Sequence, residues 1–241
     1  TCLTTLCKMT RLDEMASNDS KGCGGVMRMA PVGLFVSGKV EAATDHAQTA
    51  FDLGCRLAGI THGHPAGQHA AGVLAALIAR VLQGTSLPSA LDEVKALLKT
   101  QGNHEDTLAA INLAVRLAGD SGDSDNHLYQ LGQGWVAEEA LAIAIYCALR
   151  SDSFEEGVVL AVNLTGDSDS TGAIAGNLLG ALHGIEAIPP RWLAPLELRE
   201  VITAVADDLL SWPQWRIGDC PPADDDGRRE RAYWLERYPG D

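Results

Sequence analysis

The residues from Asp167 to Thr171 place two carboxylates and three hydroxyls in five consecutive positions. Ligand sets made only of oxygen suit Mg²⁺, Mn²⁺ or Ca²⁺ rather than Zn²⁺ or Cu²⁺. On a turn, Asp167 and Asp169 can direct both carboxylates at one ion, with a hydroxyl of Ser170 or Thr171 as a neutral third ligand. An EF-hand loop is excluded, because its closing Glu is replaced by Leu178. Since Asp, Ser and Thr are also the preferred N-caps of any helix, helix capping stays open beside metal binding.

The apolar segment after this turn carries a glycine at every fourth position: Gly172, Gly176, Gly180 and Gly184. On a helix, residues i and i+4 share a face, so these glycines form a stripe without side chains. Each interior glycine costs roughly 0.5–1 kcal/mol relative to alanine. We therefore expect a helix that packs closely against a neighbour along this stripe, with the oxygen cluster at its N-terminus.

A second candidate site is the glycine-rich stretch from Asn18 to Arg28. Gly22, Gly24 and Gly25 leave backbone amides open to an approaching ligand, and Arg28 is placed to pair with an acidic group. The spacing matches neither a P-loop nor a dinucleotide fingerprint. The stretch is therefore either a ligand loop or a tight turn before a buried helix.

The stretch Thr61-His62-Gly63-His64-Pro65 offers two histidines. Histidines at i and i+2 beside a proline make a poor zinc pair, and no third ligand stands at the required spacing. The sequence favours a helix-joining loop with exposed histidines. The alternative is a neutral imidazole that donates a hydrogen bond to a sugar or phosphate.

Hydrophobic periodicity predicts an all-α protein, which we interpret as a single domain over residues 1–241. No segment shows the alternation of a strand. Residues 120–126 are expected to form a solvated acidic loop, and Trp135 a core residue. The expected helices cover residues 1–9, 40–60, 66–83, 87–98, 105–118, a buried segment ending at 149, 154–164, the segment that begins near 172, 196–212 and 228–238.

The formal charge of −14, from 18 basic and 32 acidic residues, argues against nucleic acid or an anionic membrane as a partner. We find no signal peptide, and apolar runs such as residues 140–149 are shorter than the roughly 20 residues that span a bilayer. The six cysteines form no Cys-x-x-Cys pair and are interpreted as reduced thiols. We therefore expect a cytoplasmic protein.

Three motifs, Asn18–Arg28, Thr61–His64 and Gly166–Gly176, resemble the ADP-ribosylglycohydrolase family in the family's order. The resemblance covers residues 1–190 and implies an orthogonal helical bundle with a dinuclear Mg²⁺ or Mn²⁺ centre. The metal ligands that it implies are Asp167, Asp169 and Ser170. The residues that it places along the ADP-ribose cleft are Ser20, Gly22, Cys23, Gly24, Gly25, Arg28 and His62. Many relatives carry Asn where Cys23 stands.

The family's Thr-Asp-Asp-Thr-type motif, which supplies further metal ligands and an acidic catalytic residue, does not occur in this sequence. We therefore expect the chain to correspond to the C-terminal part of the enzyme and to bind Mg²⁺ weakly, and we name no catalytic acid or base. The function that the resemblance implies is metal-dependent hydrolysis of the glycosidic bond that links ADP-ribose to a protein side chain or a related conjugate. The alternative is a truncated, catalytically impaired relative with an ADP-ribose-binding or structural role only.

Overall fold

The computed structural model describes residues 1–11, 14–38, 45–217 and 222–238, and all regular elements in these ranges are helical. Within these ranges, β structure is limited to one isolated bridge between Gly22 and Val136. The all-α prediction is confirmed. The helices are α1 (Cys2–Leu6), α2 (Ala30–Ser37), α3 (His46–Gly59), α4 (Pro65–Leu82), α5 (Leu87–Leu98), α6 (Glu105–Ala118), α7 (Ser124–Leu131), α8 (Ala137–Arg150), α9 (Phe154–Val162), α10 (Ser168–His183), α11 (Pro190–Leu193), α12 (Arg199–Ser211) and α13 (Asp225–Arg237), with short 3₁₀ turns η1 (Cys23–Gly25), η2 (Ile185–Ala187) and η3 (Trp212–Gln214).

Most helix boundaries follow the sequence pattern. The predicted helices at 87–98 and 105–118 have the observed bounds of α5 and α6. The helix expected from residue 40 begins at His46, and residues 40–44 lie outside the described residues. The loop expected at 120–126 is wrong in its second half, because the carboxylate of Asp123 accepts the Asn126 amide at 3.1 Å and starts α7 there.

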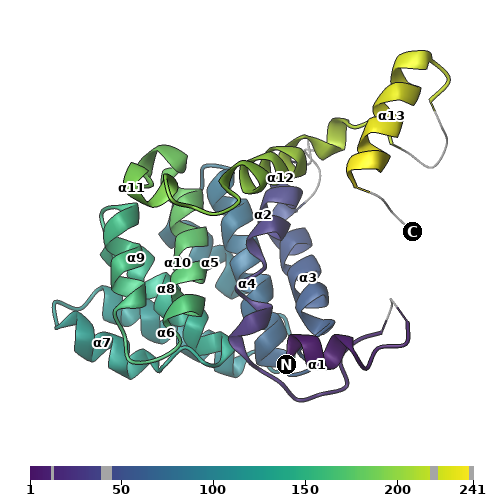
Figure 1. The fold of residues 1–241 in the computed structure, drawn as a ribbon. Coiled ribbons are helices and arrows are strands. Elements are labelled where there is room, and N and C mark those ends of the chain that lie inside the picture. The colour runs from purple at the N-terminus through teal and green to yellow at the C-terminus, as the bar shows by residue number, and fades with distance from the viewer. Residues whose placement is uncertain (12–13, 39–44, 218–221, 239–241) are drawn as a thin grey trace.

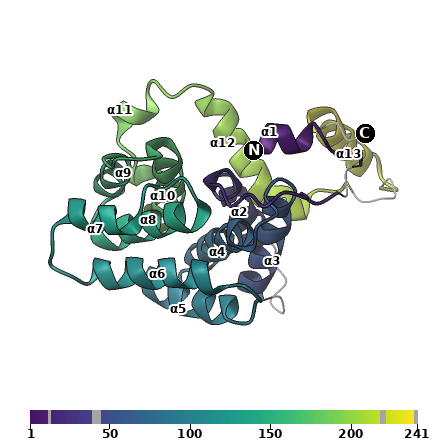
Figure 2. The same ribbon diagram turned by 90° about the horizontal axis from the view of Figure 1, so that it is seen from below.

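Helix α4 forms the centre of the fold and packs against α2, α3, α5, α8 and α10 (Figure 1, Figure 2). Of its 18 residues, 13 are buried, so it presents apolar or small side chains all round, as a core helix must. Helix α8 is the second buried helix and packs against α6, α9 and α10. Helices α4 and α8 lie at the centre of the core. Packing against this core fixes the positions of the N-terminal ends of α4, α8 and α10.

Helices α3 and α4 approach each other closely at glycines. A Cβ on Gly72 would lie 2.5 Å from Cys55 Sγ and 2.8 Å from the Phe51 carbonyl oxygen. A Cβ on Gly54 would lie 3.0 Å from Gly72 Cα. Atoms of α3 therefore occupy the space that a side chain at Gly72 would need.

The glycines of α10 behave differently, and the close packing predicted along their stripe is wrong at Gly176, Gly180 and Gly184. The nearest atom to a Cβ on Gly176 or Gly180 would be 3.9 Å away, which is an ordinary contact, and Gly184 has nothing within 4 Å. Gly172 alone in the stripe is crowded, since its Cβ would lie 2.6 Å from Val162 Cγ1. Gly184 instead ends the helix, with a φ of 76°.

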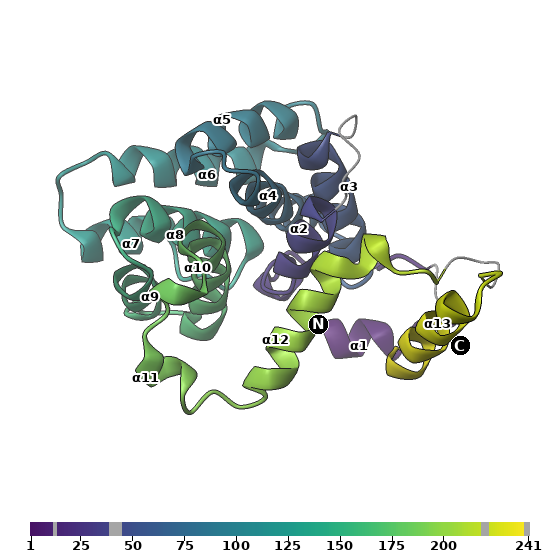
Figure 3. The ribbon, with the colours of Figure 1, turned by 90° about the horizontal axis from the view of Figure 1, so that it is seen from above.

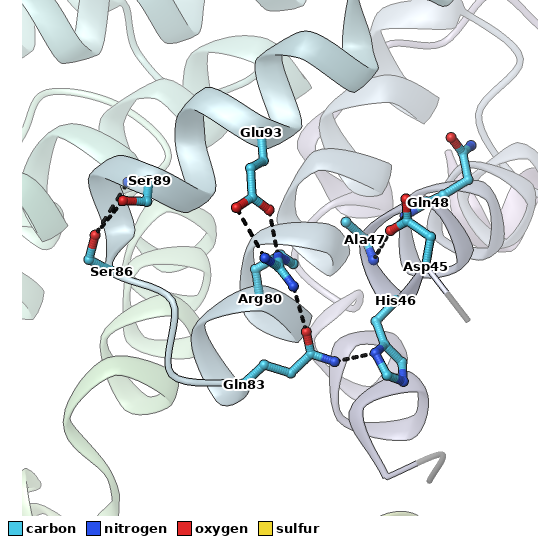
Figure 4. A network of polar contacts seen from close by, with 9 residues as sticks. All are labelled: Asp45, His46, Ala47, Gln48, Arg80, Gln83, Ser86, Ser89 and Glu93. Atoms are coloured by element: carbon cyan, nitrogen blue, oxygen red, sulfur yellow. Dashed lines mark hydrogen bonds and ion pairs between the residues drawn. The ribbon is translucent and has the colours of Figure 1, made fainter. Parts of the chain in front are cut away.

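The end of α4 opposite to His64 is held by exposed polar contacts (Figure 4). The guanidinium of Arg80 forms a two-point ion pair with Glu93 of α5, at 2.6 Å and 3.0 Å. Asp45 caps α3 by accepting the amides of Ala47 and Gln48. These contacts hold the C-terminal end of α4 against α5 and stabilise the N-terminal end of α3.

The C-terminal helices extend along and beyond the bundle. Helix α12 packs on α2, and Phe35 of α2 stacks on Trp212 with ring centroids 4.4 Å apart. Helix α13 lies beyond the end of α12 at the side of the molecule (Figure 1, Figure 3). In the described part of the chain, no helix combines the length and the apolar character needed to cross a bilayer.

The described cysteines are free thiols, as predicted: Cys2, Cys7, Cys23, Cys55 and Cys147. Burial raises the pKa of Cys55 and of Cys147 to about 12. These two side chains therefore act as small apolar core residues.

Gly72→Ala should destabilise the protein by about 1–3 kcal/mol, because its methyl group must push α3 and α4 apart. This cost exceeds the roughly 1 kcal/mol by which alanine favours a helix interior over glycine. Urea denaturation measures the difference. The matched control is Gly102→Ala, where a Cβ would meet nothing within 4 Å, and a cost at Gly72 no larger than at Gly102 would contradict the packing described.

Gly176→Ala should have the opposite sign and stabilise the protein by about 0.5–1 kcal/mol. The added methyl group makes only an ordinary contact with Val158, while the unfolded chain loses conformational freedom. The same denaturation experiment checks this expectation. A loss of stability would mean that the stripe is packed as tightly as its spacing suggested.

Candidate metal and ligand site

The oxygen-rich turn lies at the start of α10, where Asp167 is the N-cap residue and is buried. Its carboxylate makes no capping hydrogen bond of normal geometry. Instead, its Oδ2 accepts the thiol of Cys23 at 2.9 Å, and the same Sγ lies 3.3 Å from Ser170 Oγ. The Asp167 side chain is therefore linked to the stretch from Asn18 to Arg28 as well as to its own helix.

Thr171 is unsuited to act as the neutral third ligand. Its hydroxyl lies 2.7 Å from the carbonyl oxygen of Ala161 and 3.0 Å from that of Asp167, so its proton is directed to backbone carbonyls. The residue is also fully buried. Of the two hydroxyls that the sequence left open, Ser170 is the one that lies beside the carboxylate.

The protonation states around Asp167 follow from its contacts. Burial acts to raise the pKa of Asp167, but the contacts with Cys23, Asp169 and Ser170 together outweigh it and lower that pKa. Burial, and next the hydrogen bond to Asp167, raise the pKa of the Cys23 thiol to about 11. At neutral pH the carboxylate is therefore charged and the thiol keeps the proton that it donates.

The donors of this turn fit a hard divalent cation in kind. Asp167 and Asp169 interact through their side chains, and the hydroxyl of Ser170 lies next to them. Carboxylate and hydroxyl oxygens are the ligands that Mg²⁺ and Mn²⁺ prefer. Among the described residues, no group of three or more His, Cys, Asp and Glu side chains is arranged to hold a metal. Two carboxylates and one hydroxyl would form only part of a coordination sphere.

The glycine loop, defined as residues 20–28, lies against His62. A Cβ added to Gly22 or Gly24 would lie 3.7 Å from the imidazole of His62, and one added to Gly25 would lie 3.2 Å from it. His62 is 1% exposed, so the expectation of exposed histidines is wrong for this residue. His64 serves a different purpose, since its Nδ1 accepts the Ala66 amide at 3.1 Å and caps α4.

Arg28 supports His62 from behind the loop. Its Nη2 donates to Thr61 Oγ1 at 2.6 Å and to the Leu57 carbonyl at 3.0 Å, so the expected pairing with an acidic group is not what the structure places there. Thr61 Oγ1 lies 2.8 Å from His62 Nδ1. The Thr61 hydroxyl thus accepts from Arg28 and occupies His62 Nδ1, while His62 Nε2 lies on the side of Gly22.

Asn18 ties the glycine loop to the histidine turn. Its Oδ1 accepts the amides of Ser20 at 2.9 Å and Gly63 at 3.1 Å, and its Nδ2 donates to the Thr61 carbonyl at 3.0 Å. A Cβ on Gly63 would lie 1.9 Å from the Asn18 carbonyl oxygen, so the two segments touch through backbone. Ser20 also lines a cleft of about 510 Å³ whose other wall is α1 and residues 14–18.

Sequence reasoning gave no role in the site to the α7–α8 connection, which is defined as residues Gly132–Val136. Its Trp135 carbonyl accepts the Cys23 amide at 3.2 Å, and its Gln133 carbonyl accepts the Asp167 amide at 2.8 Å. Trp135 is 58% exposed, so its prediction as a core residue is wrong. The sequence signal that could have indicated this segment is Gly132-x-Gly134, a pair of glycines that lies between two helices.

The structure thus brings together most of the residues singled out in the sequence. The glycine loop, His62 and the Asp167–Ser170 turn meet through Cys23, while Arg28 faces the Thr61 side. Next to the turn opens a cleft of about 800 Å³ between α7, the α7–α8 connection and residues 162–165. Its lining includes none of the candidate metal or ligand residues, so the cleft adjoins the site and does not contain it.

Comparison with known proteins supports one family. The model of the ADP-ribosylglycohydrolase family matches residues 1–216. A protein of Archaeoglobus fulgidus is 31% identical over 192 residues, which cover 79% of this chain and 58% of that protein. The ADP-ribosyl-[dinitrogen reductase] glycohydrolase of Rhodospirillum rubrum is 25% identical over 183 residues, covering 76% of this chain and 53% of the relative.

A solved structure agrees with these matches. A chain of an ADP-ribosylglycohydrolase-related protein complex superposes with a TM-score of 0.55 and 32% identity, and the match covers 80% of this chain and 61% of the other. The chain spans about half the length of the curated relatives it matches.

Acid should destabilise the protein in part through His62. Burial first, and Arg28 second, lower the pKa of His62 in the folded state. His62 therefore binds a proton more readily in the unfolded chain than in the folded protein. As a result, the free energy of unfolding falls as the pH drops below about 6.5. In His62→Gln, the free energy of unfolding should fall less between about pH 7.5 and about pH 5.5. Urea denaturation at both pH values tests this, and an equal fall in both proteins would contradict the depressed pKa.

Proposed function

The chain belongs to the ADP-ribosylglycohydrolase family, and we propose on that premise that it binds ADP-ribose and hydrolyses its glycosidic bond to a protein side chain or related conjugate, with Mg²⁺ or Mn²⁺. The observation that carries the proposal is the 2.9 Å contact between Cys23 Sγ and Asp167 Oδ2. This contact links the glycine loop, whose amides suit a diphosphate, with the turn from Asp167 to Ser170 (the carboxylate turn), whose oxygens suit a cation. The name of the Rhodospirillum rubrum relative supports a protein-linked substrate.

The glycine loop provides anion recognition in a protein whose net charge is −14. Of its two cations, Lys21 is paired with Glu138, which raises the pKa of Lys21 and neutralises its charge locally. Arg28 donates to Thr61 and to the Leu57 carbonyl. The amides of Gly24 and Gly25 lie in the first turn of η1, where amides have no acceptor within the helix. Backbone amides rather than side-chain charge would therefore hold the diphosphate.

The carboxylate turn provides the other half of the chemistry. Hydrolysis at the anomeric carbon passes through an oxocarbenium-like state with developing positive charge. The charged carboxylate of Asp167 stabilises positive charge in this region. Acidic residues at this position offset the unfavourable field of the α10 N-terminus for a cation. A divalent ion held by Asp167, Asp169 and Ser170 would supply Lewis acidity and a template for the ribose hydroxyls.

His62 contributes a fixed, uncharged hydrogen-bond donor. Its lowered pKa keeps the imidazole neutral, and Thr61 contacts its Nδ1, so that in the tautomer with the proton on Nε2 the N–H is directed to the Gly22 side of the loop. A neutral donor beside amides suits a phosphate or sugar oxygen. Water activation is not assigned to a residue of this chain.

Asp167→Asn should weaken binding of Mn²⁺ by about 10-fold or more, because the variant loses the charge of a buried ligand. Isothermal titration with ADP-ribose, with and without Mg²⁺, should show that the ion strengthens ADP-ribose binding in the native protein and not in the variant. Asp92→Asn, an exposed carboxylate on α5, is the matched control.

A hydrolysis assay with an ADP-ribosylated protein accompanies the titration. Binding together with turnover supports the hydrolase. Binding without turnover supports a role limited to holding ADP-ribose, and absence of binding to either ligand would contradict the proposed site.

A further inference from the structure

The α7–α8 connection has an unusual backbone that must be stabilised from outside. Gly132 and Gly134 have φ values of 107° and 79°, a region that favours glycine. Glycines lose more conformational freedom on folding than other residues. A Cβ on Gly134 would lie 2.6 Å from Thr171 Cγ2, so the connection is seated directly against the start of α10.

This connection contacts both halves of the site through its backbone. On one side, the Gln133 carbonyl accepts the Asp167 amide at 2.8 Å, and a Cβ on Gly166 would lie 2.1 Å from that same oxygen. On the other side, the Trp135 carbonyl accepts the Cys23 amide at 3.2 Å. The conformation of five residues therefore sets where the carboxylate turn and the glycine loop lie relative to each other.

One side chain, that of Glu139, holds this conformation. Its Oε2 accepts the amides of Gln133 and Gly134, both at 3.1 Å. Hydrogen bonds to a carboxylate are stronger than neutral ones. A Cβ on Gly132 would lie 2.4 Å from Glu139 Cδ, so the carboxyl group lies against the bare glycine backbone.

The place of Glu139 in α8 explains how it reaches back. It is the third residue of the helix, the position at which a capping-box Glu turns back toward the N-cap amide. Here the carboxylate extends further and binds the amides two and three residues before the N-cap residue Val136. The acidic side chain also suits the positive end of the α8 dipole.

We propose that Glu139 is a positioning residue that fixes the α7–α8 connection and, through it, sets Asp167 and Cys23 together. The proposal rests on the proposed function for its effect on ligands. The hydrogen bonds of Glu139 go to the Gln133 and Gly134 amides and not to Cys23 or Asp167, so its influence on these two residues passes through the Gln133 and Trp135 carbonyls.

The test compares Glu139→Ala and Glu139→Gln with the control Glu156→Ala. Glu156 plays the same kind of role elsewhere, since its Oε2 accepts the Asp152 amide at 3.1 Å at the start of α9. Amide hydrogen exchange, followed by NMR without ligand, reports the Cys23 and Asp167 amides directly. Titrations with ADP-ribose and with Mn²⁺ report the two halves of the site.

In Glu139→Ala, exchange of the Cys23 and Asp167 amides should rise about 10-fold or more, while core amides of α4 stay protected. Affinity for ADP-ribose and for Mn²⁺ should fall together by about 10-fold. Glu139→Gln keeps an oxygen acceptor and should restore much of both. Glu156→Ala should change neither amide.

Unchanged exchange at Cys23 and Asp167 in Glu139→Ala would overturn the proposal, as would a uniform rise throughout the protein. If Glu139→Ala does not fold, Glu139→Gln gives the decision, with a smaller rise confined to the same two amides. Should the native protein bind neither ADP-ribose nor Mn²⁺, the proposed function fails, and the exchange of these amides still decides the role of Glu139.

Discussion

A carboxylate buried at the start of a helix must find hydrogen-bond donors, and one donor to Asp167 comes from a distant part of the chain. The thiol of Cys23 reaches it from the glycine loop at 2.9 Å. Because a charged group without such partners would be costly to bury, the glycine loop must lie against α10. The burial of Glu138, which pairs with Lys21, fastens the same loop to α8. The relative placement of the helix ends thus follows from the need to satisfy a few buried acids.

Local rules predicted much of the fold. The helices at 87–98 and 105–118 were predictable because their apolar periodicity and flanking residues agree, so propensity and packing point to the same bounds. The Asp167–Ser170 turn and the glycine loop were also visible, because their chemistry is written in consecutive residues. Their mutual contact was not, since nothing in a linear sequence places Cys23 beside Asp167.

The residues that sequence reasoning misjudged are those whose role depends on a partner. Arg28 was expected to pair with an acidic group, yet its guanidinium donates to Thr61 and to a backbone carbonyl. His62 lies in a loop motif and is nonetheless buried. Glycine spacing shows the same limit, since Gly72 is crowded by α3 whereas Gly176 has ordinary room. Only the approach of a second element decides whether an absent side chain is required.

The link between Cys23 and Asp167 also bears on the order of events as the chain folds, because it joins positions 144 residues apart. Contacts between distant positions require most of the intervening chain to be compact first, since the entropy of closing a long loop must be overcome. Helical hairpins such as α3–α4 can form from neighbouring residues alone. A partly folded state could therefore hold much of the helical architecture before the contact between Cys23 and Asp167 forms.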